Sequence, residues 1–219
     1  MSLVDQMALL PDEIDRESLK MVEESISQSL KMTVQEKYVL FRIVRAEGDP
    51  DIVDSVKFSP DAVEAGLGAL HLKKPVITDV RMVQVGISKA LLSSNQIETH
   101  CLIDVKETAE KAKLEGTTRS VAAMRGLERH IDGAIVAIGN APTALLALID
   151  MIDEHKVKPA LVIGMPVGFV ACAESKDELI KRSIPYMTIV GNRGGSSAAA
   201  ATVNALLDLL KSNNGVAFP

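Results

Sequence analysis

Arginines, glycines and serines occur together near the carboxyl end of the chain, in a pattern that suits the binding of an anion. Arg193 precedes Gly194 and Gly195, and Ser196 and Ser197 then begin a predicted helix. The start of a helix leaves backbone N–H groups without an intrahelical partner, and a neighbouring guanidinium can clamp a carboxylate or phosphate. These residues therefore favour a seat for an anion, although the two glycines are equally explained by a tight turn.

Two further arginines are spaced to act together on one side of a predicted helix. Arg42 and Arg45 are three residues apart, beside an apolar stripe that includes Tyr38 and Phe41. This arrangement suits a flat, apolar ligand with anionic groups at its rim, but it also fits two solvated cations placed favourably at a helix end. Arg119 falls in the first turn of another predicted helix, where the helix dipole disfavours a cation, and this misfit indicates a functional reason for it.

The usual catalytic constellations do not occur in this sequence. The four histidines are scattered without HxxxH or HExxH spacing, and no GxSxG, GxGxxG or GxxxxGK[ST] motif is present. Cys101 and Cys172 lie inside apolar runs without CxxC spacing, so we expect buried free thiols. We therefore expect no metal site, and the residues predict a pocket for an anionic small molecule.

Three apolar runs, at residues 134–143, 160–172 and 186–197, each break into a Gly-rich turn and a helix start. Each run has the length and β-branched content of a strand, and ligands of open α/β sheets bind where strands end. The sequence therefore predicts that the three turns lie together at one edge of a sheet. Asn140 and Pro142 suit the cap and first turn of the helix that follows the first run.

The remaining elements alternate in the same way. A first helix is predicted from Leu19, Val22, Ile26 and Leu30, and a second from the capping box of Thr33 and Glu36. Further expectations are a helix from Ser59 and Pro60 to about Leu70, strands at 76–80 and 97–105, helices at 107–114, 118–128 and 196–210, and a capping box of Ser175 and Glu178. The pattern predicts an α/β fold: one domain over residues 1–219, with an N-terminal helical pair and a mainly parallel sheet covered by helices on both faces.

Composition excludes several classes of partner. A net charge of -5, a pI near 5.4 and only six aromatic side chains argue against nucleic-acid binding. No apolar run approaches the ~20 residues of a membrane helix, and the first residues do not resemble a secretory signal. We expect a cytoplasmic protein without a membrane partner.

Several long motifs closely resemble the precorrin-8X methylmutase (cobalt-precorrin-8 methylmutase) family over nearly the whole chain. They are AIGNAPTALLALI at 137–149, VIGMPVGFVACAESKDEL at 162–179, GNRGGSSAAAATVNAL at 191–206, FSPDAVEAGLGAL at 58–70, TTRSVAAM at 117–124 and the pattern Asp79, Met82, Val83, Gly86. The resemblance implies an isomerase that moves a methyl group from C-11 to C-12 of a corrinoid ring and yields hydrogenobyrinate or cobyrinate. It further implies a homodimer with the active site near the subunit interface. No separate cofactor is implied, and cobalt enters only if the substrate carries it.

The resemblance also assigns site residues. Ser18 and Arg42 match positions that contact the substrate, and Arg119 matches an arginine beside the ring. Arg193 belongs to the terminal Gly-rich signature, and we also expect Asn140, Gly194 and Gly195 to be substrate-binding positions.

One position departs from the family pattern. Where the family has His in Arg-Ile-Val-His-Ala, this chain has Arg45 in the sequence FRIVRAEG. The family histidine is taken to protonate the macrocycle, whereas a guanidinium, with a pKa above ~12, cannot serve as a proton donor. Three hypotheses follow. The first is a methylmutase in which Arg45 acts electrostatically or another group supplies the proton, and the second is a catalytically impaired tetrapyrrole-binding or corrinoid-binding protein. The third is a different small-molecule enzyme or nucleotide-dependent protein on the same scaffold.

Overall fold

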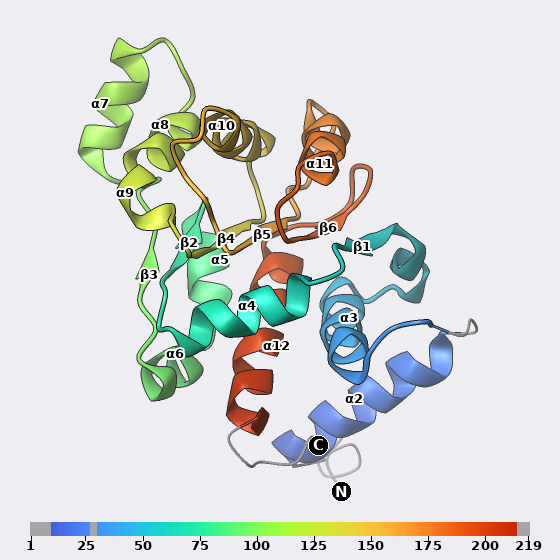
Figure 1. Ribbon diagram of the computed structural model, residues 1–219. Helices are drawn as coiled ribbons and strands as arrows, with labels where there is room; N and C mark the ends of the chain where they lie inside the picture. The colour runs from blue at the N-terminus through green and yellow to red at the C-terminus, as the bar shows by residue number, and fades with distance from the viewer. Residues whose placement is uncertain (1–9, 27–29, 214–219) are drawn as a thin grey trace, which may run out of the picture.

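A six-stranded sheet is the centre of the computed structural model, which describes residues 10–26 and 30–213 (Figure 1). The strand order is β1 (Val56–Phe58), β6 (Tyr186–Ile189), β5 (Leu161–Gly164), β4 (Ile135–Ile138), β2 (Val76–Thr78) and β3 (Thr99–His100). Neighbouring strands pair in parallel except β1, which pairs antiparallel with β6. Every residue of β4 and β5 is buried, as expected for central strands of a parallel sheet covered on both faces.

Helices cover both faces of the sheet (Figure 1). One face carries α8 (Arg119–Gly126), α9 (Glu128–Ile131), α10 (Pro142–Asp153) and α11 (Cys172–Ile180), with α7 (Lys106–Leu114) packed beside α8. The other face carries α3 (Val34–Glu47), α4 (Ala62–His71), α5 (Arg81–Gly86), α6 (Lys89–Asn95) and α12 (Ser196–Asn213). A short 3-10 helix, η1 (Pro50–Ser55), joins α3 to β1, and α2 (Pro11–Ser25) packs on the outside of α3.

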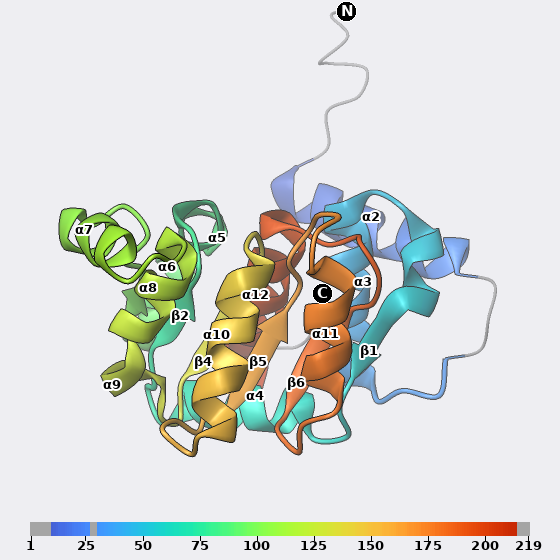
Figure 2. The ribbon, with the colours of Figure 1, turned by 90° about the horizontal axis from the view of Figure 1, so that it is seen from above.

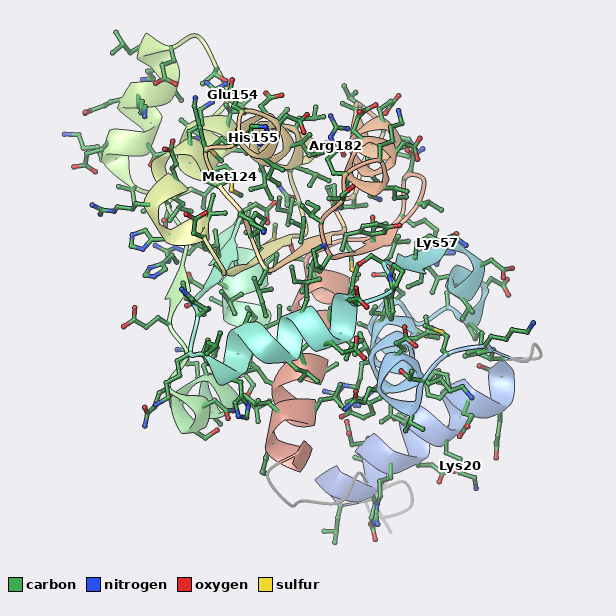
Figure 3. The ribbon with its side chains drawn as sticks, in the orientation of Figure 1. Lys20, Lys57, Met124, Glu154, His155 and Arg182 are labelled. Carbon is green, nitrogen blue, oxygen red and sulfur yellow. The ribbon has the colours of Figure 1, made fainter. Side chains whose placement is uncertain are left out.

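Each face of the sheet has its own hydrophobic core. Side chains of α8, α10 and α11 form one, and those of α3, α4, α5 and α12 form the other. In Figure 3, Met124 comes from α8 on one side of α10 and Arg182 from just beyond α11 on the other, where it pairs with Asp153 of α10 at 2.7 Å. The second core depends on α12, which packs closely on α5: a Cβ added at Gly86 would lie 2.8 Å from the Cβ of Ala200.

The predicted architecture is confirmed. The sheet is mainly parallel, helices lie on both faces, and α2 and α3 form the N-terminal helical pair. The three apolar runs become β4, β5 and β6, each followed by a Gly-containing turn and a helix. Both cysteines are free and buried, as expected. No helix within the described residues is long and apolar enough to span a membrane.

Several element boundaries were predicted wrongly. Ser175 and Glu178 do not form a capping box, because α11 begins at Cys172 and the Ser175 hydroxyl donates to the Cys172 carbonyl within the helix at 2.8 Å. Ser59 does not cap α4, which begins at Ala62; its hydroxyl accepts a hydrogen bond from the Tyr186 N–H at 2.9 Å instead.

Three predicted elements are shorter than expected. Helix α2 ends at Ser25, so Ile26 is its cap and Leu30 lies beyond it, while residues 27–29 are outside the described part. The strand predicted at 97–105 is reduced to β3, and β2 ends at Thr78 because Val80 is already the N-cap of α5.

Candidate functional site

The chain leaves the carboxyl ends of β2 and β4 toward opposite faces of the sheet. Helix α5 follows β2 on one face, and α10 follows β4 on the other. Ligands of open α/β sheets bind at such a switch point. In Figure 2 this edge faces the top of the view, with α5 on one side and α2 on the other.

Asp79 is buried at this switch point, with an exposed fraction of 2%. Its carboxylate accepts hydrogen bonds from the backbone N–H groups of Gly139, Asn140 and Ala141 at 3.0, 2.9 and 2.8 Å. Burial raises the pKa of Asp79, and these three hydrogen bonds oppose the shift. The expected cap at Asn140 was wrong: Ala141 is the N-cap of α10, and the Asp79 carboxylate satisfies the N–H groups there.

Lys176 is a second buried charge behind the same edge, with an exposed fraction of 0%. Its ammonium donates to the carbonyls of Gly191 at 2.8 Å and Arg193 at 2.6 Å, so α11 holds the loop between β6 and α12. Burial lowers the pKa of Lys176. Sequence reasoning missed this residue; the only signal was a lysine beside buried residues on a helix.

The turn at Gly194 and Gly195 is packed against the loop that follows β5. Gly194 has φ +135°, and a Cβ at this position would lie 2.6 Å from the Met165 carbonyl oxygen. The Gly195 N–H donates to that same oxygen at 2.9 Å, and α12 begins at the next residue. Both glycines are therefore required by backbone conformation, and Gly194 by close approach as well.

A cavity of about 500 Å³ opens beside the start of α12, between α2 and α3 on one side and α5 on the other. Its volume falls within the usual range for small-molecule sites. The described residues that line it are Asp15, Arg42, Arg45, Ala46, Met82, Gly86, Ser196, Ser197, Ala200, Ala201 and Asn204.

Arg42 and Arg45 both face this cavity, and both bind a carboxylate of α2. Arg42 Nη1 lies 3.1 Å from each oxygen of Asp15, and Arg45 Nη1 forms an ion pair with the same carboxylate. Arg42 also reaches Asp208 of α12 at 3.6 Å. The predicted helical spacing thus places the two guanidiniums together, and Asp15 is a partner that the sequence did not reveal.

The aromatic residues of α3 do not share the cavity with the arginines. Tyr38 and Phe41 line a separate hollow between α2 and α3, so the apolar stripe expected beside Arg45 is not part of its wall. The Tyr38 hydroxyl donates to Asp208 at 3.3 Å. Burial and, after it, the Asp208 carboxylate raise the pKa of Tyr38 to about 12.

The other predicted site residues lie outside the described lining of this cavity. The Ser18 hydroxyl donates to the Ile14 carbonyl at 2.6 Å within α2. Arg119 is exposed at the start of α8, whose cap Thr118 contacts Thr143 of α10 at 3.3 Å. Arg193 is exposed and pairs with Asp49 at 2.8 Å. The structure thus brings together Arg42, Arg45 and the beginning of α12, and leaves Ser18, Arg119, Asn140 and Arg193 outside that cavity.

Glu47, the last residue of α3, is a candidate that sequence reasoning missed. Its carboxyl group is close enough to the side chain of Ser197, which lines the cavity, for that side chain to lower the pKa of Glu47. Burial raises the pKa of Glu47, while Arg193, Ser197 and Lys176 lower it by a smaller amount. Glu47 is thus a partly buried carboxyl group one side chain away from the cavity.

The cavity can bind anions and stabilise charge. Its described ionisable lining residues are Asp15, Arg42 and Arg45, so no imidazole is among them. Within the described residues, no group of three or more His, Cys, Asp or Glu side chains could hold a metal ion. Guanidiniums and helix N–H groups suit carboxylates, and Met82, Ala200 and Ala201 provide apolar contact surface.

Known proteins resemble this chain over most of its length. The family profile described as precorrin-8X methylmutase matches residues 13–209. The cobalt-precorrin-8 methylmutase of Priestia megaterium is 39% identical over 212 residues, which cover 97% of this chain and 93% of that protein. The precorrin-8X methylmutase of Pseudomonas aeruginosa is 43% identical over 168 residues, 75% of this chain and 80% of that protein.

The fold is also similar to that of solved structures. The precorrin-8X methyl mutase of Thermus thermophilus superposes with a TM-score of 0.87 at 35% identity, covering 95% of this chain and 100% of that chain. A precorrin-8X methylmutase related protein superposes with a TM-score of 0.78 at 29% identity, covering 88% of this chain and 100% of that chain.

Proposed function

The chain belongs to the precorrin-8X methylmutase family, and we propose that it is an isomerase of cobalamin biosynthesis that moves a methyl group from C-11 to C-12 of precorrin-8X or cobalt-precorrin-8. The observation that supports this reaction most directly is the cavity that joins Arg42, Arg45 and the start of α12. A corrinoid substrate is a large apolar ring with carboxylates at its rim. The guanidiniums match the carboxylates, and the alanines of α12 match the ring.

The protein has to position the substrate and stabilise charge, because the methyl group moves within one molecule. Arg42 and Arg45 bind rim carboxylates, and the charge of Arg45 also stabilises negative charge that develops on the ring. Glu47, next to the cavity-lining Ser197, is the acid that supplies a proton to the ring, since a guanidinium does not release one near neutral pH.

The test is turnover by purified protein of precorrin-8X and of cobalt-precorrin-8, assayed separately by the visible spectrum of the ring. We expect conversion of at least one substrate, and a loss of about tenfold or more in kcat/KM for Arg45→Met, which keeps an unbranched apolar stem but removes the charge. Arg81→Met is the matched control, because Arg81 pairs with Asp104 at 2.9 Å and is outside the described cavity lining. No turnover of either substrate by the wild-type protein would contradict the proposed reaction.

One observation favours a second candidate, a corrinoid-binding protein without mutase activity. The described cavity lining has no imidazole, and Arg45 is engaged by Asp15. This candidate predicts tight binding of hydrogenobyrinate or cobyrinate without catalysis by the wild-type protein, and a gain of turnover in Arg45→His.

We further propose that the enzyme is a cytoplasmic homodimer that needs no separate cofactor. Exposed apolar side chains at the carboxyl edge support the dimer: Phe169 is 89% exposed and Val170 86%, and Met82 and Val85 of α5 are exposed as well. Light scattering should give twice the mass of the chain, and Phe169→Ser should shift the protein toward monomer. Turnover should survive dialysis against a chelator, and the native protein should fractionate with cytoplasmic markers.

A further inference from the structure

Asp15 has an unusual place among the charged groups of the cavity. It is a carboxylate in a site whose other charged lining residues, within the described part of the chain, are two arginines. Its two oxygens contact Arg42 Nη1 at 3.1 Å each, and it also pairs with Arg45. One carboxylate of the protein therefore bridges both guanidiniums that an external carboxylate would use.

These contacts are exposed enough for a ligand to compete with them. The exposed fraction of the side chain is 33% for Asp15, 35% for Arg45 and 18% for Arg42. Ion pairs that remain in contact with water are weak, and an incoming anion can replace one of the partners. A ligand carboxylate that approached while Asp15 stayed in place would instead meet a like charge beside the same guanidiniums.

The element that carries Asp15 is held differently from the arginines. Arg42 and Arg45 belong to α3, which packs into the hydrophobic core through Val39, Ile43 and Val44. Helix α2 lies outside α3 and contributes partly buried Val22 to that core (Figure 1). An exchange of partners can therefore move the Asp15 carboxylate while the guanidiniums stay in position.

We propose that Asp15 is an internal substitute for a ligand carboxylate: it pairs with Arg42 and Arg45 and is displaced when a carboxylate-bearing ligand binds. Asp15 thereby sets the affinity and the charge specificity of the cavity. This inference rests on the proposed function only for the identity of the ligand, a corrinoid with carboxylates at its rim.

The experiment compares binding to wild type, Asp15→Asn and Glu17→Gln by isothermal titration calorimetry. Asp15→Asn keeps the size of the side chain and removes its charge, while Glu17→Gln removes the same charge from an exposed position of α2 outside the described cavity lining. The probes are cyanide-ligated cobyrinic acid, its neutral heptamethyl ester, and glutarate as a small dicarboxylate unrelated to corrins.

We expect Asp15→Asn to bind the corrin acid and glutarate about tenfold more tightly than wild type, because the competing carboxylate is gone. The affinity for the ester should change by less than about twofold, and Glu17→Gln should resemble wild type with every probe. Unchanged or weaker binding of both acids to Asp15→Asn would overturn the proposal and would indicate that Asp15 only orients the arginines.

Glutarate separates this proposal from the proposed function. Tighter binding of glutarate to Asp15→Asn, with no binding of the corrin acid to any of the three proteins, would support the role of Asp15 and contradict a corrinoid ligand. Binding of the corrin acid that is equal in wild type and Asp15→Asn would support the ligand class and contradict the role of Asp15.

Discussion

The charged groups behind the carboxyl edge of the sheet are held differently from those at the rim of the cavity. Asp79 and Lys176 are buried, and their partners are backbone groups of the loops that begin α10 and α12. Arg42 and Arg45 are partly exposed, and their partners are the side chains of Asp15 and Asp208.

This difference separates two tasks. A buried ion that is hydrogen-bonded to the backbone of a loop fixes the path of that loop, because each bond that breaks leaves a polar group unsatisfied. A partly exposed ion pair stabilises less and can exchange its partner. The protein thus uses charge in the interior to shape the site and charge at the rim to bind ligand.

The largest effect on stability is expected when a methyl group is added at Gly194, in the loop between β6 and α12. Gly194→Ala combines a backbone conformation that only glycine adopts easily with a contact of 2.6 Å between the new Cβ and the Met165 carbonyl oxygen. We expect a loss of about 4 kcal/mol in the free energy of unfolding, measured by urea denaturation.

Gly195→Ala is the matched control. Gly195 has a similar φ of +141°, but apart from its two chain neighbours no heavy atom lies closer than 3.9 Å to its added Cβ. It should cost only about 2 kcal/mol, the strain of the backbone alone. Equal losses in the free energy of unfolding for the two variants would mean that the contact with the Met165 carbonyl oxygen does not add to the cost at Gly194.

Removal of the buried ammonium should have the next largest effect. Lys176→Met leaves the Gly191 and Arg193 carbonyls without this donor, and we expect a loss of about 3 kcal/mol in the free energy of unfolding. Lys181→Met makes the same change at an exposed surface pair with Glu178 and should cost less than about 1 kcal/mol. A smaller loss for Lys176→Met than for Lys181→Met would contradict the role of Lys176 in holding the loop between β6 and α12.

At the rim, the expected effect is on binding rather than on stability. Arg45→Met should change the free energy of unfolding by less than about 1 kcal/mol, yet weaken binding of cyanide-ligated cobyrinic acid about tenfold or more. Titration calorimetry on Arg45→Met and Arg81→Met would check this. An equal affinity of the two variants would remove Arg45 from the binding site.

The smallest effect is expected for Tyr38, whose contribution to stability depends on pH. Burial and the Asp208 carboxylate raise the pKa of Tyr38 to about 12, above the ordinary value of 10.0. Stability from the neutral phenol is therefore complete below pH 10 and is lost as the pH rises toward about 12, because the unfolded chain ionises first. Tyr38→Phe should be less sensitive than wild type to a change from pH 9 to pH 11 in urea denaturation. An identical response of the two proteins would contradict this contribution.

Local patterns in the sequence were sufficient for much of the fold. Thr33 and Glu36 form the expected capping box, with the Glu36 N–H bonded to the Thr33 hydroxyl at 3.2 Å, because this motif depends only on residues three apart. The same pattern failed at Ser175 and Glu178. There, Cys172 already starts α11 and places Ser175 inside the helix, so tertiary context determined the boundary.

The site was predictable only where spacing along one element determines it. Arg42 and Arg45 come together because helical geometry fixes their separation, and the sequence predicted this. Asp15, Asp79 and Lys176 meet their partners through long-range packing, and no local pattern encodes it. Arg119 and Arg193 carried sequence signals, yet within the described residues they lie outside the cavity that holds Arg42 and Arg45.

The most direct test of the site is a crystal structure of the protein with cobyrinate or hydrogenobyrinate bound. The account predicts ring carboxylates in hydrogen-bond contact with Arg42 and Arg45, the macrocycle against the first turns of α12, and the Asp15 carboxylate moved away from both guanidiniums. A corrinoid bound elsewhere, with the contacts of Asp15 to Arg42 and Arg45 intact, would contradict it.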